Sequence, residues 1–247
     1  MPRIVRSFIL MITFLTRIPV PMNFEFNNDD FVKGFPFFPV IGFLVGSFIS
    51  LPFLIQDRMP DTIFPLIVIV IYLLVVGGLH IDGVSDVFDG IFSARTRDRM
   101  IEIMEDSRVG AFGVIGLIIY FMGLYIGLFE VAKLELGWLY VLVMPVVGRT
   151  MALIGSGISK YAKKEGLGKS LVDGTKPVVS FIAVMLLCVG AYLININVFI
   201  SVAVTVVIVF MIIWRIHIIL GGITGDVVGM LVEISQVVFL LTLAIVN

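Results

Sequence analysis

Three aspartates, Asp82, Asp86 and Asp89, recur at spacings of four and three residues. On a helix, which advances about 100° per residue, these positions fall within a stripe about 60° wide, so their carboxylates point the same way. Like charges at this spacing destabilise a helix unless something neutralises them. A divalent cation is the simplest candidate, and Mg²⁺ or Mn²⁺ suits hard oxygen ligands on a short, rigid stripe. The stripe therefore predicts a metal site.

A second pair of acids, Glu102 and Asp106, is again spaced by four residues and could supply further ligands from a facing helix. Four arginines are interleaved with the acids of this segment: Arg95, Arg97, Arg99 and Arg108. Arginine and carboxylate side chains pair readily in a solvated loop, which is the alternative to metal binding.

His80 immediately precedes the aspartate stripe. Its imidazole could act as a general base or as a ligand. It could equally be a histidine at a helix end that a backbone carbonyl or Asp82 satisfies.

A basic loop, Ser159–Pro177, contains the string Gly166-Leu-Gly-Lys-Ser170. The string is similar to the end of a phosphate-binding P-loop, but the first glycine of that motif would fall at Lys163 and no strand is expected before it. The P-loop interpretation is therefore excluded. Backbone N–H groups at Gly166 and Gly168 and the amine of Lys169 could still hold a phosphate. The alternative is a loop that touches anionic lipid headgroups.

A third feature lies near the end of the chain, at Gly221–Asp226. Thr224 is expected to cap the following helix, which places Asp226 in its first turn, where the helix dipole favours an anion. Glu233, seven residues later, lies on the same face but inside an apolar span, where an acid is costly and suggests function. Its obvious partner is Arg149, so a purely structural buried ion pair is the alternative.

The composition shows which elements must position these residues. Of 247 residues, 60% are hydrophobic and 14% charged, and the mean hydropathy is +1.14. A soluble enzyme of this size cannot bury so much apolar surface, and disorder requires the opposite composition. We therefore expect an all-α polytopic membrane protein with one domain over residues 1–247.

About 20 apolar residues cross a bilayer as a helix, which predicts seven transmembrane helices. The expected spans are Pro36–Ile55, Thr62–Leu79, Val109–Val131, Gly137–Ile158, Val178–Ile194, Val198–Trp214 and Val227–Val246. The first segment, Arg3–Pro21, has too short an apolar stretch to cross. It reads better as an interfacial amphipathic helix than as a signal peptide, because no small-residue cleavage site follows.

Lysine and arginine set the expected orientation. With the N-terminus inside and the C-terminus outside, 14 of the 17 basic residues fall on the inner side and only Arg58 and Lys133 on the outer side. We therefore expect a multi-pass protein of the cell inner membrane whose polar loops are cytoplasmic. Membrane lipid is an expected partner, a homo-oligomer is possible, and nucleic acid is not expected.

Clustered carboxylates, a divalent metal and nearby Arg and Lys side chains suit phosphoryl transfer, in which the cations stabilise a pyrophosphate and its leaving group. A free carboxylate or His80 would accept the proton of the attacking hydroxyl. Asp106 is the expected ligand or base, with Arg95 and Arg108 on phosphate oxygens.

Four motifs, in order along nearly the whole chain, resemble those of the cobalamin synthase family, the adenosylcobinamide-GDP ribazoletransferases. They are Phe14-Leu-Thr-Arg-Ile-Pro-Val-Pro21; Gly77-Gly-Leu-His-Ile-Asp-Gly-Val-Ser-Asp-Val-Phe-Asp-Gly90 with Glu102-Ile-Met-Glu-Asp-Ser-Arg-Val-Gly-Ala-Phe-Gly113; Gly166-Leu-Gly168; and Gly221-Gly-Ile-Thr-Gly-Asp-Val-Val-Gly229. The continuation Met230-Leu-Val-Glu233 departs from the small and polar residues expected there.

The resemblance implies a Mg²⁺-dependent membrane enzyme that joins adenosylcobinamide-GDP to α-ribazole or α-ribazole 5′-phosphate with release of GMP, the last step of cobalamin assembly. For that reaction, the residue patterns above predict metal binding by Asp82, Asp86, Asp89 and Glu102, catalysis by Asp106 and His80, and substrate binding by Arg95, Arg108, Lys169, Gly166, Gly168 and Asp226.

Two alternatives remain. A CDP-alcohol phosphotransferase shares Asp86-x2-Asp89-Gly90, but three residues instead of two precede Ala94-Arg95. A cation transporter would place acids at mid-membrane depth and show internal repeats, and the sequence shows no such repeat.

Overall fold

The computed structural model describes residues 1–21 and 23–247, and this part of the chain is helical with no strand. Its α-helices are α1 Arg3–Leu15, α2 Asn28–Val32, α3 Phe38–Ile49, α4 Phe64–Val76, α5 Leu79–Phe92, α6 Arg97–Met104, α7 Ala111–Val131, α8 Gly137–Ile158, α9 Leu167–Gly174, α10 Pro177–Ile194, α11 Ile196–Leu220 and α12 Gly225–Val246. Two 3₁₀ segments, η1 Phe35–Phe37 and η2 Leu51–Arg58, flank α3.

The all-α membrane bundle is confirmed within the described residues, and six of its seven expected spans are found as continuous stretches. Six helical stretches are long and apolar enough to cross a membrane: 28–58, α7, α8, α10, α11 and α12. The remaining apolar stretch is α4 with α5, a pair bent by 98° that forms either a broken span or a re-entrant loop. The expected span Thr62–Leu79 therefore breaks at Gly77, whose φ of +75° is a conformation that side-chain-bearing residues rarely adopt.

The turn between the fifth and sixth spans is shorter than the three residues left between the expected spans. A single residue, Asn195, with φ −170°, separates α10 from α11. Its side-chain oxygen accepts the N–H of Val198 at 2.8 Å and caps α11.

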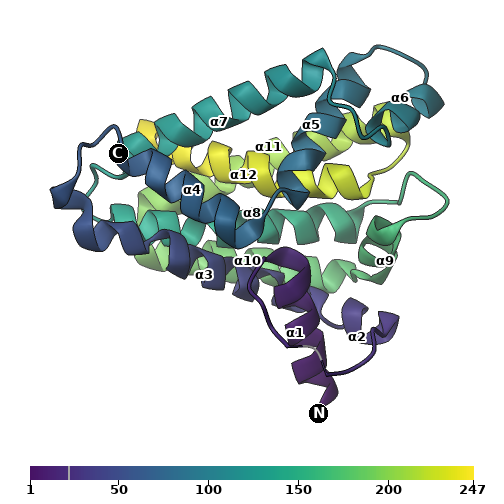
Figure 1. Cartoon of the computed structure of the whole chain (residues 1–247), viewed down its shortest axis with the longest axis horizontal. Coiled ribbons are helices and arrows are strands. Elements are labelled where there is room, and N and C mark those ends of the chain that lie inside the picture. Colours follow the sequence, from purple (N-terminus) through teal and green to yellow (C-terminus); the bar gives the residue numbers. More distant parts are fainter. Residues whose placement is uncertain (22) are drawn as a thin grey trace.

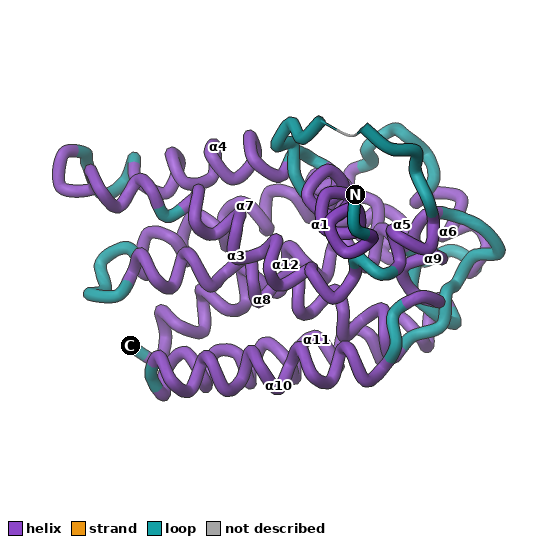
Figure 2. The backbone as a smooth tube through the Cα atoms, turned by 90° about the horizontal axis from the view of Figure 1, so that it is seen from below, coloured by secondary structure: helices purple, strands orange, loops and turns teal. Residues whose placement is uncertain are grey.

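The long helices run side by side, with α8 and α12 at the centre of the bundle (Figures 1 and 2). About 78% of the α8 span and 67% of the α12 span are buried, against 17% for α10. Helix α3 packs closely on α8, because a Cβ at Gly42 or Gly46 would collide with the α8 backbone at Pro145 or Leu142. Small residues allow such close approach in membranes, where no hydrophobic effect drives helices together.

Helix α1 runs across the long helices instead of alongside them (Figures 1 and 2). Its 13 residues are too few to cross a bilayer. Leu10, Met11 and Leu15 are buried against the bundle, whereas Met1 and Ile4 are exposed. The interfacial position of α1 in a membrane stays a prediction.

The polar segments gather at one end of the bundle, which we call the polar end: α5, α6, α9, the loop 159–166 and the start of α12 (Figure 1). Arg97 of α6 joins the end of α11 and the loop 159–166, since its Nε donates to Leu220 O at 2.8 Å and its Nη2 to Ala162 O at 2.6 Å. A short parallel bridge joins Tyr161 to Ile223. The segments that the sequence assigned to one side of the membrane therefore meet in space.

Candidate functional site

Helix α5 carries the aspartate stripe and packs on the start of α12. A Cβ at Gly83 would collide with the backbone of Asp226, and one at Gly229 would lie 3.1 Å from His80 Cα. The glycines therefore bring the stripe close to Asp226. The stripe is helical, as predicted, but burial grades along it: Asp82 is exposed, Asp86 half-buried and Asp89 buried.

The acids of α5 and α12 repel one another electrostatically. Asp86 is acted on by the negative charges of Asp82, Asp226 and Asp89, while Lys163 opposes them. The amine of Lys163 lies 3.5 Å from Asp226 Oδ2 and 3.1 Å from Glu105 Oε1. Burial opposes the charge on Lys163, but Asp226 and the hydrogen bond to Glu105 outweigh it and raise the pKa of Lys163. One lysine thus partly balances several carboxylates.

Asp89 has a structural partner that the sequence analysis did not predict. Its carboxylate accepts the N–H of Gly110 at 2.6 Å and of Gly113 at 2.8 Å. These N–H groups begin α7, so Asp89 satisfies unpaired donors at a helix N-terminus and complements its dipole. A Cβ at Gly110 or Gly113 would strike this carboxylate. Both oxygens of Asp89 are therefore occupied by the start of α7.

Glu102 and Asp106 each form an ion pair with an arginine, which the sequence analysis gave as the alternative to metal binding. Glu102 accepts from Arg99 at 2.7 Å, and both side chains are exposed. Asp106 accepts from Arg108 Nε at 3.0 Å, Nη2 at 2.7 Å and backbone N–H at 3.0 Å. Within the described residues, no group of three or more His, Cys, Asp or Glu is assembled into a metal site.

The hydrogen bonds from the Arg108 side chain and backbone lower the pKa of Asp106 to about 2. A general base works best when its pKa lies near the operating pH. The pair therefore suits Asp106 better as a ligand or a local partner of Arg108 than as a base. Arg95 is exposed and lines a hollow of about 580 Å³ with Asp89, Ser93 and Arg99.

A cavity of about 290 Å³ at the polar end, here called the central cavity, collects several residues that the sequence analysis selected separately: His80, Gly166, Gly168 and Asp226. Gly168 fits closely against Gly225, because a Cβ on it would lie 2.7 Å from Gly225 Cα. Thr224 caps α12 as predicted, its Oγ1 accepting the N–H of Val227 at 3.2 Å. The basic loop and the α12 motif therefore form one site.

Four further polar residues line the central cavity and were not selected from the sequence: Glu105, Tyr161, Lys163 and Glu165. Lys163 stood out only as one of several loop lysines, and nothing in its spacing distinguished it. Lys169, which the sequence analysis selected, does not line the central cavity. Its amine donates to Lys164 O at 3.0 Å, and its side chain lines a neighbouring hollow of about 650 Å³.

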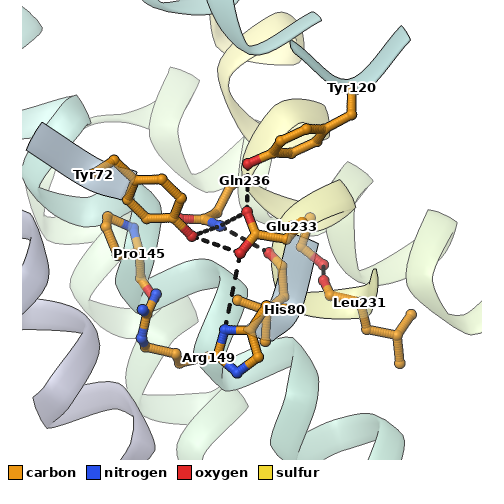
Figure 3. Close-up of polar contacts among 10 residues, drawn as sticks. Tyr72, His80, Tyr120, Pro145, Arg149, Leu231, Glu233 and Gln236 are labelled. Carbon is orange, nitrogen blue, oxygen red and sulfur yellow. Dashed lines mark hydrogen bonds and ion pairs between the residues drawn. The ribbon is translucent and has the colours of Figure 1, made fainter. Parts of the chain in front are cut away.

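Behind His80 lies a buried polar cluster centred on Glu233 (Figure 3). Glu233 accepts hydrogen bonds from Tyr72 at 2.7 Å, from Tyr120 and from Gln236 at 3.2 Å. The Nδ1 atom of His80 lies 3.9 Å from Glu233 Oε1. The cluster therefore joins α4, α5, α7 and α12 at one point.

The expected direct ion pair between Arg149 and Glu233 is not formed. Arg149 is fully buried and donates only a long bond, 3.4 Å, to Pro145 O, while its Nε and Nη2 have no partner among the described residues. Glu233 already accepts three hydrogen bonds, and it interacts with the Arg149 charge only at longer range. Figure 3 shows the guanidinium beside Tyr72, separated from the carboxylate.

Comparison with known proteins places this arrangement in a family. The chain is 39% identical to an adenosylcobinamide-GDP ribazoletransferase of Alkaliphilus oremlandii and 36% identical to one of Acetivibrio thermocellus, each over 96% of both chains. It is 32% identical to another of Clostridium botulinum strain Okra over the full length of both. No solved structure matches. The model of the cobalamin-5-phosphate synthase family matches residues 7–244, and the chain belongs to that family of membrane transferases.

Proposed function

We propose that this protein transfers the adenosylcobinamide phosphate group from adenosylcobinamide-GDP to α-ribazole or α-ribazole 5′-phosphate, with release of GMP. The relatives carry this activity in their names. The observation that carries the proposal is that Asp226, 3.5 Å from Lys163, packs on α5, where the charges of Asp82, Asp226 and Lys163 all act on Asp86. Carboxylates that can bind a metal ion, next to a lysine that can bind phosphate oxygens, suit a substrate with a metal-bound diphosphate.

In the proposed reaction, a ribose hydroxyl oxygen attacks the phosphorus that bears the cobinamide. A new P–O bond forms, the bond to the bridging diphosphate oxygen breaks, and GMP leaves with that oxygen. The hydroxyl proton passes to a free carboxylate of the site or to His80, which lines the central cavity. Lys163 and Arg108 neutralise non-bridging oxygens, and the N–H groups of Gly166 and Gly168 lie where a phosphate could approach them.

Mg²⁺ fits the donor set, because Asp82 and Asp86 repel each other and Asp82 is exposed, making no ion pair among the described residues. Asp82 and Asp86 would hold the ion, with Asp226 nearby; when bound, it would neutralise the diphosphate and stabilise the departing GMP. Asp89 and Glu102 remain weaker candidates because α7 and Arg99 already occupy them. The alternatives, a CDP-alcohol phosphotransferase and a cation transporter, are not favoured by the relatives.

The test is to incubate membranes containing the protein with adenosylcobinamide-GDP and α-ribazole, with and without Mg²⁺, and to measure GMP and completed corrinoid. We expect both products only with Mg²⁺. Asp82→Ala and Asp86→Ala should lose activity at limiting Mg²⁺, whereas Asp57→Ala, an exposed aspartate at the other end of the bundle, should not. Full activity of both site variants would refute the metal assignment.

We also propose that the polar end faces the cytoplasm, because most basic residues lie there. After replacement of Cys188, the one cysteine of the chain, a cysteine at Lys164 should be shielded from an impermeant thiol reagent in intact cells. A cysteine at Lys133, in the α7–α8 turn of the opposite end, should react. The reverse labelling pattern would overturn this orientation.

A further inference from the structure

A second hollow, of about 500 Å³, adjoins the central cavity at the start of α5, where Leu79 lines both. Its lining includes Arg17, Gly78, Asp82, Ser85, Val109 and Leu117. His80 and Asp82 are separated by about 200° around the helix, so α5 presents one to each side. We call this the Arg17 hollow. The central cavity and the Arg17 hollow therefore flank the same aspartate stripe.

Arg17 is held in place by its backbone. Its N–H donates to Val75 O at 2.7 Å, which ties the segment after α1 to the end of α4. Thr16 Oγ1 bonds to Ile12 O at 2.6 Å and accepts from Ile18 N at 3.2 Å, fixing the turn. The chain therefore delivers Arg17 to this position through a defined local structure.

The Arg17 side chain lies over Gly77. A Cβ at Gly77 would come within 2.5 Å of Arg17 Nε and 3.2 Å of its Cγ. Because Gly77 also has φ +75°, the break between α4 and α5 both requires glycine and leaves room for the arginine. The helix break and the arginine thus form one feature.

The polar groups of the Arg17 hollow have no partners in the described part of the chain. Arg17 and Asp82 are exposed, and neither makes a salt bridge or a side-chain hydrogen bond within the described residues. Ser85 is 1% exposed, and its Oγ has no hydrogen-bond partner. An unpaired buried hydroxyl costs free energy unless a ligand satisfies it. A cation, a carboxylate and a buried hydroxyl therefore line one hollow without pairing with one another.

We propose that the Arg17 hollow binds a phosphate group, with Arg17 and Ser85 donating to its non-bridging oxygens beside Asp82. A guanidinium presents a planar fork of N–H donors that matches two phosphate oxygens. This inference rests on the proposed function and deepens it: the phosphate is part of the diphosphate of the nucleotide-activated substrate. The same chemistry would suit the phosphate of a lipid headgroup, because α1 lies across the bundle.

The test compares Arg17→Ala and Arg17→Lys with Arg3→Ala, an exposed arginine at the start of α1. Each protein is placed in nanodiscs of neutral lipid alone or with about one-third anionic lipid, and KM for adenosylcobinamide-GDP is measured at saturating acceptor. We expect Arg17→Ala to raise KM at least about 10-fold in both lipids, the size expected for a lost charge-assisted bond. The KM of Arg17→Lys should lie between those of the wild type and Arg17→Ala, because lysine keeps the positive charge but lacks the planar fork of N–H donors.

Binding of GDP, with and without Mg²⁺, gives a readout that does not need turnover. It should weaken at least about 10-fold in Arg17→Ala and not in Arg3→Ala. A KM change confined to anionic lipid, with unchanged GDP binding, would overturn the assignment in favour of a headgroup. Unchanged KM and unchanged GDP binding would overturn it outright.

The two proposals fail separately. If the wild-type protein releases no GMP from adenosylcobinamide-GDP, the proposed function fails, and the GDP-binding comparison still decides the Arg17 hollow. If the wild type turns over normally but the Arg17 variants keep its KM and GDP affinity, only the phosphate site at the Arg17 hollow is refuted. Because Arg17→Lys preserves size and charge, it provides a folded variant if Arg17→Ala does not reach the membrane.

Discussion

Replacing Glu233 by Gln removes one negative charge from the buried cluster while nearly preserving its shape. Glutamine keeps one carbonyl oxygen, so at most two of the donors from Tyr72, Tyr120 and Gln236 lose an acceptor. Hydrogen bonds between membrane helices contribute about 0.6 kcal/mol each on average, so this loss is roughly 1 kcal/mol. Removing one partner of a buried pair of charges costs more, about 3–5 kcal/mol.

The charge effect therefore dominates, and it acts through Arg149, whose guanidinium is buried and poorly satisfied. We expect Glu233→Gln to lower the free energy of unfolding by about 3 kcal/mol or more. Arg149→Met should also destabilise the protein. The double variant should be less destabilised than the sum of the two by at least about 2 kcal/mol, because neither charge is then left alone.

The assay is equilibrium unfolding in mixed micelles as the denaturing detergent is increased, followed by helicity and tryptophan fluorescence. Glu130→Gln is the control, since Glu130 pairs with Lys133 at 2.9 Å on the surface and should change stability by less than about 1 kcal/mol. Additivity of the Glu233 and Arg149 variants within about 0.5 kcal/mol would refute the idea that these charges stabilise each other without touching.

Gly83→Ala should lower turnover at least about 10-fold, because its methyl group would push α5 away from α12 at Asp226. Gly190→Ala is the control, since no atom lies within 4 Å of its added Cβ. Equal turnover of the two variants would contradict the role of this close packing. Asp89→Ala should lower the free energy of unfolding by about 2 kcal/mol through the exposed start of α7, whereas Asp82→Ala should leave melting unchanged. The lowered pKa of Asp106 keeps its carboxylate charged above about pH 3, and its pairing is lost only as pH falls through about 2. Asp106→Asn should therefore lower the rate without moving the pH–rate profile between pH 5 and 9, approximately; a shifted acidic limb would show that Asp106 is the base.

The sequence alone determined the class of protein and the sites where chemistry concentrates. Composition requires a membrane bundle, because 60% hydrophobic residues cannot be buried in a soluble domain of this size. Helical spacing placed Asp82 and Asp86 on one face, and basic residues grouped the polar loops at one end. These are local or one-dimensional properties, and they survive folding.

Only the tertiary structure decided which partner each polar side chain meets. Asp89 looked identical to Asp82 in spacing, yet the start of α7 folds onto it and leaves Asp82 exposed. In the sequence, nothing distinguishes Lys163 from the other lysines of its loop; in the structure, the loop places its amine 3.5 Å from Asp226 Oδ2. Arg149 and Glu233 both lie in the bundle interior, but Tyr72 of α4 and Tyr120 of α7, not Arg149, donate hydrogen bonds to the Glu233 carboxylate. Hydrogen bonds act over about 3 Å between residues far apart in sequence, so spacing along the chain cannot reveal them.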